Sequence, residues 1–421
     1  MKVDTLIHSA RQLLALTPRA QRGRSLGDLQ LLQDGGLAIR EGRIVEVGPT
    51  RDLLDHHTAD QKIDARGLIL LPGFVDCHTH AMWVGDRTEE FQRRIAGESY
   101  SEILAAGGGI LSTVRHTRQA STDQLVKETL PRLEQMLAHG TTTCEIKTGY
   151  GLEMETELRM LEAIARLRKL VPMTLVATFL PAHALPEEYA SRPEDYVRQV
   201  IETMLPEAML RWRTLVRDQE PLFADVFCEK GAFDLEQARR ILERARDLGY
   251  LLKIHADEFE TLGAVRLAVE LGAASADHLV VTPWEDIQAL GPSSTVAVSL
   301  PGTTFGLGEL SFTPAHQLLE ANALLALASD LNPGTSPCES LQMIIAIACR
   351  YLRLTPAQAI AASTINAAAA LRREDQLGSL TPGKQADLMA LEVPSYLHLG
   401  YQYGTNLVKW VMRRGQLVYS S

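Results

Sequence analysis

Short apolar segments alternate with helix-type segments along most of this chain, and this alternation restricts the folds that it can adopt. Stretches such as ELRMLEAIARLRKLV and LEQARRILERARDLG place apolar residues every three or four positions, as one buried helix face requires. The segments between them have the continuous apolar character of strands buried on both faces. They are GFVDCHTH (73–80), TTTCEIKTG (141–149), TLVATFLPAH (174–183), FADVFCE (223–229), LLKIHADE (251–258), SADHLV (275–280), TVAVSLPG (295–302) and LLALASDLNPG (324–334). Eight strand–helix units predict an α/β protein with a (β/α)8 barrel of parallel strands.

The two ends of the chain differ from this pattern. Residues 1–65 contain GGLAIREGRIVEVGP, two short alternating strands around a Glu41-Gly42 turn. Residues 382–421 contain NLVKWVMRRGQLVYSS, which is also strand-like with a glycine turn. Neither end is long enough to bury a sheet by itself. We therefore expect the two ends to pair into one small β-module beside a barrel of residues 66–381.

The composition argues against several classes of function. The chain of 421 residues carries 42 Lys and Arg against 52 Asp and Glu, a net charge of −10, and has no basic stripe of the kind that binds nucleic acid. Its apolar runs are too short for a membrane span, and MKVDTLIHSARQLL lacks the apolar centre of a signal peptide. Five scattered cysteines without a C-x-x-C pair indicate reduced thiols. We expect a cytoplasmic protein without nucleic-acid or membrane partners.

Histidines and a carboxylate follow several of the expected strands. His78 and His80 end the first strand and point to the same side, because residues i and i+2 of a strand share a face. His255, His278 and Asp330 end the fifth, sixth and eighth strands. Each one alone is equally compatible with a hydrogen-bonded core residue. The carboxyl ends of barrel strands meet at one mouth, so together these side chains predict a divalent metal site.

Longer motifs carry a resemblance to a known superfamily. PGFVDCHTH, the histidines of the fifth and sixth strands, ASD near the eighth strand and the closing PGKQADLMAL resemble the amidohydrolase superfamily over essentially the whole chain. The resemblance implies a distorted (β/α)8 TIM-like barrel with a small composite β-sandwich, formed by residues 1–65 and 382–421. It also implies that a metal-activated water hydrolyses an amide, an amidine or a related C–N bond.

Within that superfamily the chain is similar to the imidazolonepropionase family. The similar stretches are DRTEEFQRRIAGESYSEILAAGGGILSTVRHTR, KTGYGL, LPAHALP, KIHADEF and SDLNPGTSP. The resemblance implies an enzyme of histidine degradation that opens the ring of 4-imidazolone-5-propanoate to give N-formimidoyl-L-glutamate. It also implies a homodimer.

The family match assigns the metal ligands. His78, His80, His255 and Asp330 match ligands of one divalent or trivalent ion per subunit, zinc or iron, between which imidazole and carboxylate ligands do not discriminate. Such an ion lowers the pKa of a bound water toward neutrality. Asp330 is also expected to accept the proton of the nucleophile and to pass it to the leaving nitrogen.

Two further residues are expected to act in catalysis. His278 fits a group that polarises the scissile carbonyl, and its alternative is a hydrogen-bonding partner of a ligand. Glu258 is expected to accept hydrogen bonds from the N–H groups of the bound ring, and its alternative is a solvated loop acid. Glu229, after the fourth strand, would bridge a second metal ion in a two-metal enzyme, whereas the family comparison favours one metal.

Substrate recognition requires a local cation because the chain is acidic overall. Arg87 follows the first strand closely, and its guanidinium can bind a carboxylate through two parallel hydrogen bonds. The family resemblance assigns it the propionate of the substrate. The other residues expected to contact the substrate are Tyr100, Tyr150, His183, Glu258, Asn332, Gly334 and Thr335.

These substrate contacts have simpler alternatives. The alternative for Tyr150 is a buried side chain that pairs with a backbone group. Residues 332–335 carry an Asn-Pro-Gly sequence, which is first of all a turn. The glycines at 107–109 lack the Gly-Lys-Ser/Thr ending of a nucleotide loop, so a lid hinge is the better hypothesis for them.

Two other functions compete with this interpretation. A different cyclic amidohydrolase or an aromatic-ring deaminase of the same superfamily would share the metal ligands but would not need Arg87 to meet a carboxylate. A non-catalytic scaffold would keep the barrel and lose the ligands, all four of which are present here. Substrate turnover and metal content separate these alternatives.

Overall fold

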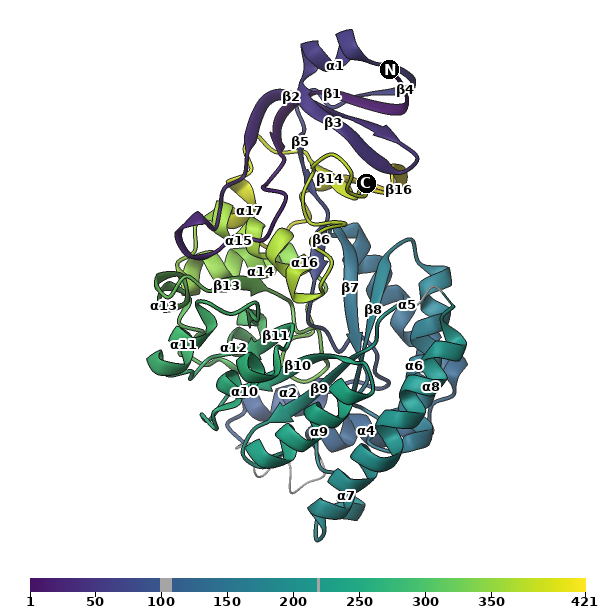
Figure 1. Ribbon diagram of the computed structural model, residues 1–421, viewed down its shortest axis with the longest axis vertical. Helices are drawn as coiled ribbons and strands as arrows, with labels where there is room; N and C mark the ends of the chain where they lie inside the picture. Colours follow the sequence, from purple (N-terminus) through teal and green to yellow (C-terminus); the bar gives the residue numbers. More distant parts are fainter. Residues whose placement is uncertain (99–107, 218–219) are drawn as a thin grey trace.

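Eight parallel strands form a nearly closed barrel in the computed structural model, which describes residues 1–98, 108–217 and 220–421 (Figure 1). Each strand pairs with its neighbours in chain order. The strands are β6 (Phe74–Asp76), β7 (Thr141–Lys147), β8 (Thr174–Ala182), β9 (Phe223–Cys228), β10 (Leu251–Ala256), β11 (Ser275–His278), β12 (Val296–Ser299) and β13 (Leu324–Leu327). All eight lie within the segments expected from the sequence, so the barrel prediction is confirmed.

The barrel closes just beyond the ends of its first and last strands. Thr79 forms a parallel bridge with Leu331. The backbone N–H of Asp330 donates to the His78 carbonyl at 3.0 Å, and the N–H of His80 donates to the Leu331 carbonyl at 2.9 Å. The segments that follow β6 and β13 therefore lie side by side at the carboxyl end of the barrel.

Helices cover the outside of the barrel (Figure 1). Those after β6 are α2 (Thr88–Ile95), α4 (Ile110–Gln119) and α5 (Thr122–Ala138). Between β7 and β9 lie α6 (Met154–Leu170), η2 (Glu187–Tyr189), α7 (Pro193–Gln199), η3 (Val200–Met204) and α8 (Leu205–Leu215). The remaining helices are α9 (Leu235–Asp247), α10 (Ala264–Leu271), α11 (Trp284–Leu290), α12 (Pro301–Leu307), α13 (Ala315–Glu320), α14 (Leu341–Ile347), η4 (Ala348–Leu352), α15 (Pro356–Ala362) and α16 (Ile365–Ala370).

Local sequence signals set several of these helix ends. The Asp234 side chain accepts the Gln237 N–H, and the Gln237 side chain accepts the Asp234 N–H, which forms a capping box at the start of α9. Gly272 ends α10 in the left-handed conformation, with φ of 67°. These ends fix where each helix returns the chain to the next strand.

The two ends of the chain form one mixed sheet above the barrel, with the strand order β16-β15-β14-β5-β1-β2-β3 and β4 beside β1 (Figure 1). Its strands are β1 (Lys2–Leu14), β2 (Leu31–Arg40), β3 (Arg43–Pro49), β4 (Thr58–Asp64), β5 (Ile69–Pro72), β14 (Leu388–Leu391), β15 (Val408–Arg413) and β16 (Gln416–Ser420). The short helices η1 (Gly23–Ser25), α1 (Thr50–His56) and α17 (His398–Tyr401) lie in the same terminal segments. The expected joint module is confirmed, and the domain boundaries at 65 and 381 stay predictions.

The small sheet and the barrel are joined directly through one glycine. Strand β5 of the small sheet runs into barrel strand β6 with only Gly73 between them. A Cβ atom at Gly73 would lie 2.3 Å from the Thr142 hydroxyl oxygen, so no larger residue fits there. The first barrel strand, which leads to His78 and His80, is therefore anchored to the small sheet at its beginning.

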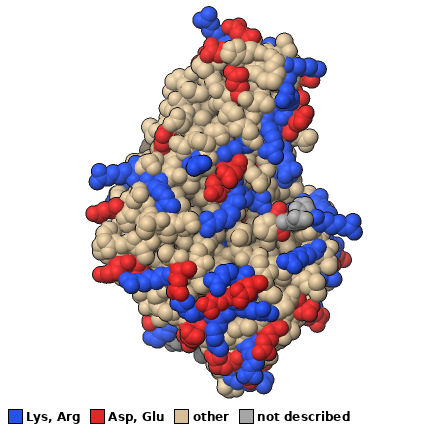
Figure 2. All heavy atoms as spheres, viewed as in Figure 1, with Lys and Arg blue, Asp and Glu red and all other residues tan. Residues whose placement is uncertain are grey.

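The surface shows no separation of charge on the face in Figure 2, where acidic and basic side chains intermix. In the described part of the chain, every helix is too short or too polar to cross a bilayer. This agrees with the mixed composition of the sequence.

A core substitution tests the joint sheet. Leu388 is fully buried on β14, opposite Pro72 of β5 and Met412 of β15. Leu388→Ala should lower the free energy of unfolding by about 2–5 kcal/mol through the cavity that it leaves. Urea unfolding measures the loss. Leu417→Ala, on an exposed side chain of β16, is the control and should change stability by less than about 0.5 kcal/mol. Equal effects of both variants would contradict the joint core.

Candidate metal centre

Three histidines converge at the carboxyl end of the barrel. His78 and His80 follow β6 and His255 lies in β10, and ligand atoms of all three lie within 4.8 Å of one another. The Nε2 atoms of His80 and His255 are 3.3 Å apart. All three side chains are buried. Burial lowers the pKa of His78 and of His80 well below their usual range, so both rings are neutral, as metal ligands require.

Asp330 completes this cluster from the other side of the barrel seam. Its Oδ1 lies 3.5 Å from His78 Nε2 and 3.6 Å from His80 Nε2. Its Oδ2 accepts a hydrogen bond of 2.5 Å from the Thr303 hydroxyl, which fixes the carboxylate plane. Asp330 has φ of 49°, a left-handed conformation that is uncommon outside glycine, and this turns the chain directly after β13.

The cluster has the dimensions of a metal site. Four ligand atoms at about 2.1 Å from a tetrahedral ion are about 3.4 Å apart. Three separations are close to this: 3.3 Å between His80 Nε2 and His255 Nε2, and 3.5 and 3.6 Å from Asp330 Oδ1 to the Nε2 atoms of His78 and His80. His78 Nε2 and Asp330 Oδ1 are buried and have no hydrogen-bond partner. Unpartnered buried polar atoms are costly, and a metal ion at this point satisfies both of them. The three histidines therefore fit a metal site, Asp330 lies beside two of them, and the four-residue ligand set stays a prediction.

Two buried carboxylates orient the histidine rings from below. Asp277 Oδ2 lies 2.6 Å from His78 Nδ1, and Asp225 Oδ2 lies 3.0 Å from His255 Nδ1. A carboxylate at Nδ1 fixes the ring with its Nε2 lone pair directed at the metal position. Sequence analysis missed both aspartates, although a charged residue inside an apolar strand is the signal that would have indicated them.

His278 and Glu258 face the same mouth. The His278 ring centroid lies 5.5 Å from that of His78, and His278 Nδ1 lies 3.6 Å from Glu258 Oε2. His278 has φ of 83°, which breaks the alternation of β11, so the His278 ring and the carboxylate of its neighbour Asp277 both face the histidine cluster. Burial raises the pKa of Glu258 well above its usual range, and the charges of Asp330 and Glu229 raise it further. Glu258 is therefore not a fully solvated loop acid.

His183 and Tyr150 form the wall beside the histidine cluster. The His183 ring stacks on the His80 ring, with centroids 4.6 Å apart and an interplanar angle of 13°. Its Nδ1 lies 3.0 Å from the Gly149 carbonyl, so Nδ1 carries the proton and Nε2 is available as an acceptor. Burial, assisted by His255, lowers the pKa of His183 to about 3. The Tyr150 ring lies 5.5 Å from the His183 ring and is buried.

Arg87 lies against the turn that follows Asp330. Its Nε donates to Glu90 Oε2 at 2.9 Å, and its Nη2 pairs with the other oxygen of the same carboxylate. Glu90 therefore occupies one edge of the guanidinium. A Cβ atom at Gly334 would lie 2.2 Å from Arg87 Nη1, so a larger residue there would displace the Arg87 guanidinium. Arg87, Gly334 and Thr335 border a mainly apolar cavity of about 500 Å³.

Asn332 organises the turn that carries Gly334 and Thr335. Its side-chain Nδ2 donates to the Asp330 carbonyl at 2.7 Å, and its Oδ1 accepts the N–H groups of Gly334 and Thr335, both at 2.8 Å. The turn interpretation of this sequence is therefore correct. A direct contact of Asn332 with substrate stays a prediction.

The other expected features fall outside the histidine cluster. Tyr100 and most of the expected lid lie outside the described residues. Gly109 is described, and its N–H donates to Glu90 Oε2 at 2.8 Å. The Glu229 carboxylate accepts the N–H groups of Phe259 and Glu260, both at 3.0 Å. It therefore supports the loop after β10, and the described structure does not group it with the histidines.

Glu157 is a further residue that sequence analysis missed. This buried carboxylate, on α6, accepts N–H groups of Gly149, Gly151 and Leu152 at 2.8–3.1 Å. Burial raises its pKa, and these hydrogen bonds oppose the rise. Glu157 thus holds the loop on which Tyr150 lies. No motif indicates this role, because it depends on how α6 packs against the loop.

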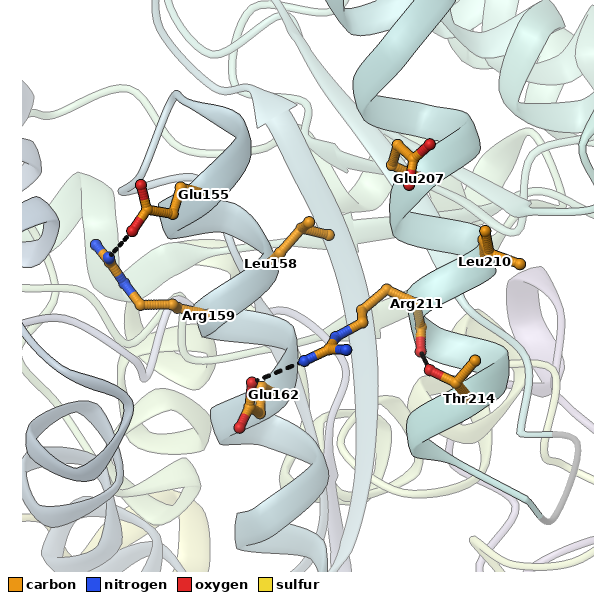
Figure 3. Close-up of a pocket in the computed structure, with 8 residues that line it drawn as sticks. All are labelled: Glu155, Leu158, Arg159, Glu162, Glu207, Leu210, Arg211 and Thr214. Atoms are coloured by element: carbon orange, nitrogen blue, oxygen red, sulfur yellow. Dashed lines mark hydrogen bonds and ion pairs between the residues drawn. The ribbon is translucent and has the colours of Figure 1, made fainter.

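A second hollow lies on the outer wall of the barrel, between α6 and α8 (Figure 3). Its rim consists of ion pairs, Arg159 with Glu155 at 2.9 Å and Arg211 with Glu162 at 3.2 Å. None of the residues that line it belongs to the histidine cluster. It is a groove between surface helices and not part of the site.

The barrel, the sheet built from both ends and the ligand cluster at the strand ends together define an amidohydrolase. A sequence profile of the Amidohydrolase family matches residues 309–418. The chain belongs to the imidazolonepropionase family. It is 54% identical to the imidazolonepropionase of Herpetosiphon aurantiacus, over 99% of this chain and 97% of that protein. It is 50% identical to the imidazolonepropionase of Chloroflexus aggregans, over 99% of each chain.

Solved structures agree with the fold. The guanine deaminase of E. coli superposes with a TM-score of 0.75 at 16% identity, over 99% of each chain. An adenosine deaminase from Xanthomonas campestris with bound zinc gives a TM-score of 0.73 at 20% identity, over 99% of this chain and 93% of that one. At these identities the likeness extends to the fold alone.

A substitution in α6 tests the role of Glu157. Glu157→Gln replaces one acceptor oxygen with an N–H2 group that faces backbone N–H donors. It should lower the free energy of unfolding by about 1–3 kcal/mol, as measured with urea. Glu155→Gln is the matched control, because this exposed carboxylate in the first turn of the same helix pairs, among the described residues, with Arg159 alone. A loss in the control as large as that in Glu157→Gln would contradict the proposed loop anchor.

Proposed function

We propose that this chain hydrolyses 4-imidazolone-5-propanoate to N-formimidoyl-L-glutamate, a step of histidine degradation. The observation that carries the proposal is the cluster of His78, His80, His255 and Asp330 at the barrel mouth, in a chain 54% identical to an imidazolonepropionase. The family resemblance further supports a cytoplasmic homodimer. Light scattering on the purified protein tests the dimer.

The same four residues hold one metal ion per subunit in this proposal, either zinc or iron. When bound, such an ion supplies Lewis acidity, which lowers the pKa of a coordinated water and polarises a substrate oxygen. Asp277 and Asp225 keep the His78 and His255 rings in the orientation that this requires.

The reaction adds water across the ring amide. A bond forms between the water oxygen and the ring carbonyl carbon, and the bond from that carbon to the ring nitrogen breaks. Asp330 accepts the proton of the attacking water and delivers it to the leaving nitrogen, so that no external acid is needed. The Thr303 hydroxyl donates to Asp330 Oδ2 and so holds the carboxylate in place for this transfer. His278, buried beside His78, donates a hydrogen bond to the carbonyl oxygen as charge develops there.

The remaining residues recognise the substrate. Arg87 binds the propionate with the guanidinium edge that Glu90 leaves available. Glu258 meets the ring N–H groups, and His183 accepts a hydrogen bond through Nε2. Tyr100, Tyr150, Asn332, Gly334 and Thr335 complete the proposed contacts.

Turnover and metal dependence test the proposal together. The metal-loaded protein should consume 4-imidazolone-5-propanoate, followed by its ultraviolet absorbance, and lose activity after dialysis against a chelator. Asp330→Asn should lower kcat by about 10²–10⁴-fold with the fold retained by circular dichroism. No turnover by the metal-loaded protein, together with ammonia release from a nucleobase, would instead identify a deaminase. Less than about a tenth of an equivalent of bound metal after loading would favour a non-catalytic scaffold.

Arg87→Met tests propionate recognition. It should raise KM about 10–100-fold with little change in kcat, because a charged hydrogen bond to a group remote from the reacting bond is lost. An analogue with an ethyl group in place of the propionate distinguishes a loss of carboxylate recognition from a loss of activity toward every substrate. Arg87→Met should turn over this analogue as well as the wild-type protein does. Arg211→Met, in the outer groove of Figure 3, is the control and should leave KM unchanged. An unchanged KM in Arg87→Met removes Arg87 from the site.

A further inference from the structure

Five charged side chains fill the interior of the barrel directly beneath the histidine cluster. They are Glu145, Lys147, Asp225, Lys253 and Asp277, each at most 1% exposed. Barrel interiors are ordinarily filled by layers of branched apolar side chains. Removing five charges from water costs much free energy, and apolar residues of similar volume are often at least as stabilising. The five charged side chains are therefore not explained by the stability of the barrel.

Lys147 is the member that reaches both carboxylates behind the histidines. Its Nζ lies 2.7 Å from Asp225 Oδ2 and 3.8 Å from Asp277 Oδ2. It also lies 3.2 Å from Glu145 Oε1. Lys253 is oriented differently. Its Nζ lies 3.7 Å from Asp277 Oδ2, donates to the Cys77 carbonyl at 2.5 Å and lies 3.2 Å from Glu145 Oε1, so Lys253 shares Asp277 with Lys147.

The ammonium of Lys147 and the histidine rings share the same oxygens. Asp225 Oδ2 meets Lys147 Nζ at 2.7 Å and His255 Nδ1 at 3.0 Å. Asp277 Oδ2 meets His78 Nδ1 at 2.6 Å and lies within 3.8 Å of Lys147 Nζ. Each oxygen therefore lies between the ammonium of Lys147 and a ring nitrogen of a histidine, and Asp277 Oδ2 is in addition 3.7 Å from Lys253 Nζ.

We propose that Lys147 is a positioning residue of the metal centre. Its ammonium holds Asp225 and Asp277 so that His255 and His78 both direct Nε2 to one point. The inference rests on the proposed function, because it concerns the affinity of that centre for its ion. Lys147 touches neither the substrate nor the ion, and it acts only through the two carboxylates.

The charge balance of the group provides a test that separates positioning from stability. Within these five side chains two lysines stand against three carboxylates, so Lys147→Met leaves one cation among three anions. The nearby buried carboxylate of Asp76, which accepts the Ser329 N–H, is the same in every variant. Adding Glu145→Gln restores the original excess of one negative charge without restoring the ammonium at Asp225. The double variant should therefore regain stability and still bind metal weakly.

The experiment compares the wild-type protein with Lys147→Met, Glu145→Gln, the double variant and Lys384→Met. Lys384 is a matched control, because it is buried but donates to the carbonyl groups of Pro18 and Leu377, away from the histidines. Chelator competition gives the affinity of each metal-free protein for Zn²⁺. The visible spectrum of bound Co²⁺ reports the geometry of its ligands, and thermal unfolding of the metal-free protein reports stability.

Lys147→Met and the double variant should bind Zn²⁺ about 10–100-fold more weakly than the wild-type protein, with an altered Co²⁺ spectrum. Glu145→Gln and Lys384→Met should keep the wild-type affinity and spectrum. Wild-type affinity in Lys147→Met, or affinity that recovers with stability in the double variant, would overturn the inference. If Lys147→Met does not fold, the Zn²⁺ affinity and the Co²⁺ spectrum of the double variant decide the question alone. A wild-type protein that binds no metal would refute the proposed function, whereas normal wild-type binding with unaffected variants would refute only the role of Lys147.

Discussion

The site depends on the backbone hydrogen bonds that close the barrel beside its first strand. The segment His78–His80 is held on one side by β7, through the Lys147 N–H and the Thr79 carbonyl at 3.0 Å. On its other side, the His78 carbonyl accepts the Asp330 N–H at 3.0 Å. The two histidines and the aspartate are 250 residues apart along the chain, and these bonds place them in adjacent backbone segments. Without this closure the aspartate would not reach the histidines.

The charged side chains beneath the histidine cluster add a second constraint to the closure of the barrel. Backbone hydrogen bonds fix where each histidine stands, but they still allow its imidazole to rotate about the side-chain bonds. Asp277 and Asp225 restrict this rotation for His78 and His255. Carboxylates buried so deeply need partners of opposite charge, and the lysines of β7 and β10 lie within reach. The buried charges and the orientation of the histidine rings are thus linked through Asp225 and Asp277.

Sequence reasoning succeeded where the signal is local and periodic. The eight strands followed from apolar runs between helical stretches, and the metal-ligand candidates followed from their places at strand ends. It missed Asp225 and Asp277, although a charged residue inside an apolar strand would have indicated them. It also missed Glu157, because its partners depend on how α6 packs against the loop at Gly149–Leu152. It could not decide what the Asn332 side chain does, since the same sequence serves a turn and a ligand contact. It also could not decide whether Glu229 bridges a second metal ion. In the structure the Glu229 carboxylate accepts N–H groups of the loop after β10.

The sequence by itself determined the barrel class, the pairing of the two chain ends and the histidines and aspartate available for a metal site. These properties depend on side-chain periodicity and on the rule that parallel strands end at one edge, and both can be inferred from residue order. Only the tertiary structure decided which nitrogen atoms converge, which carboxylates orient them and which charges lie beneath. Those relations depend on strand register and on the left-handed conformations of His278 and Asp330. The order of residues along the chain does not specify either of them.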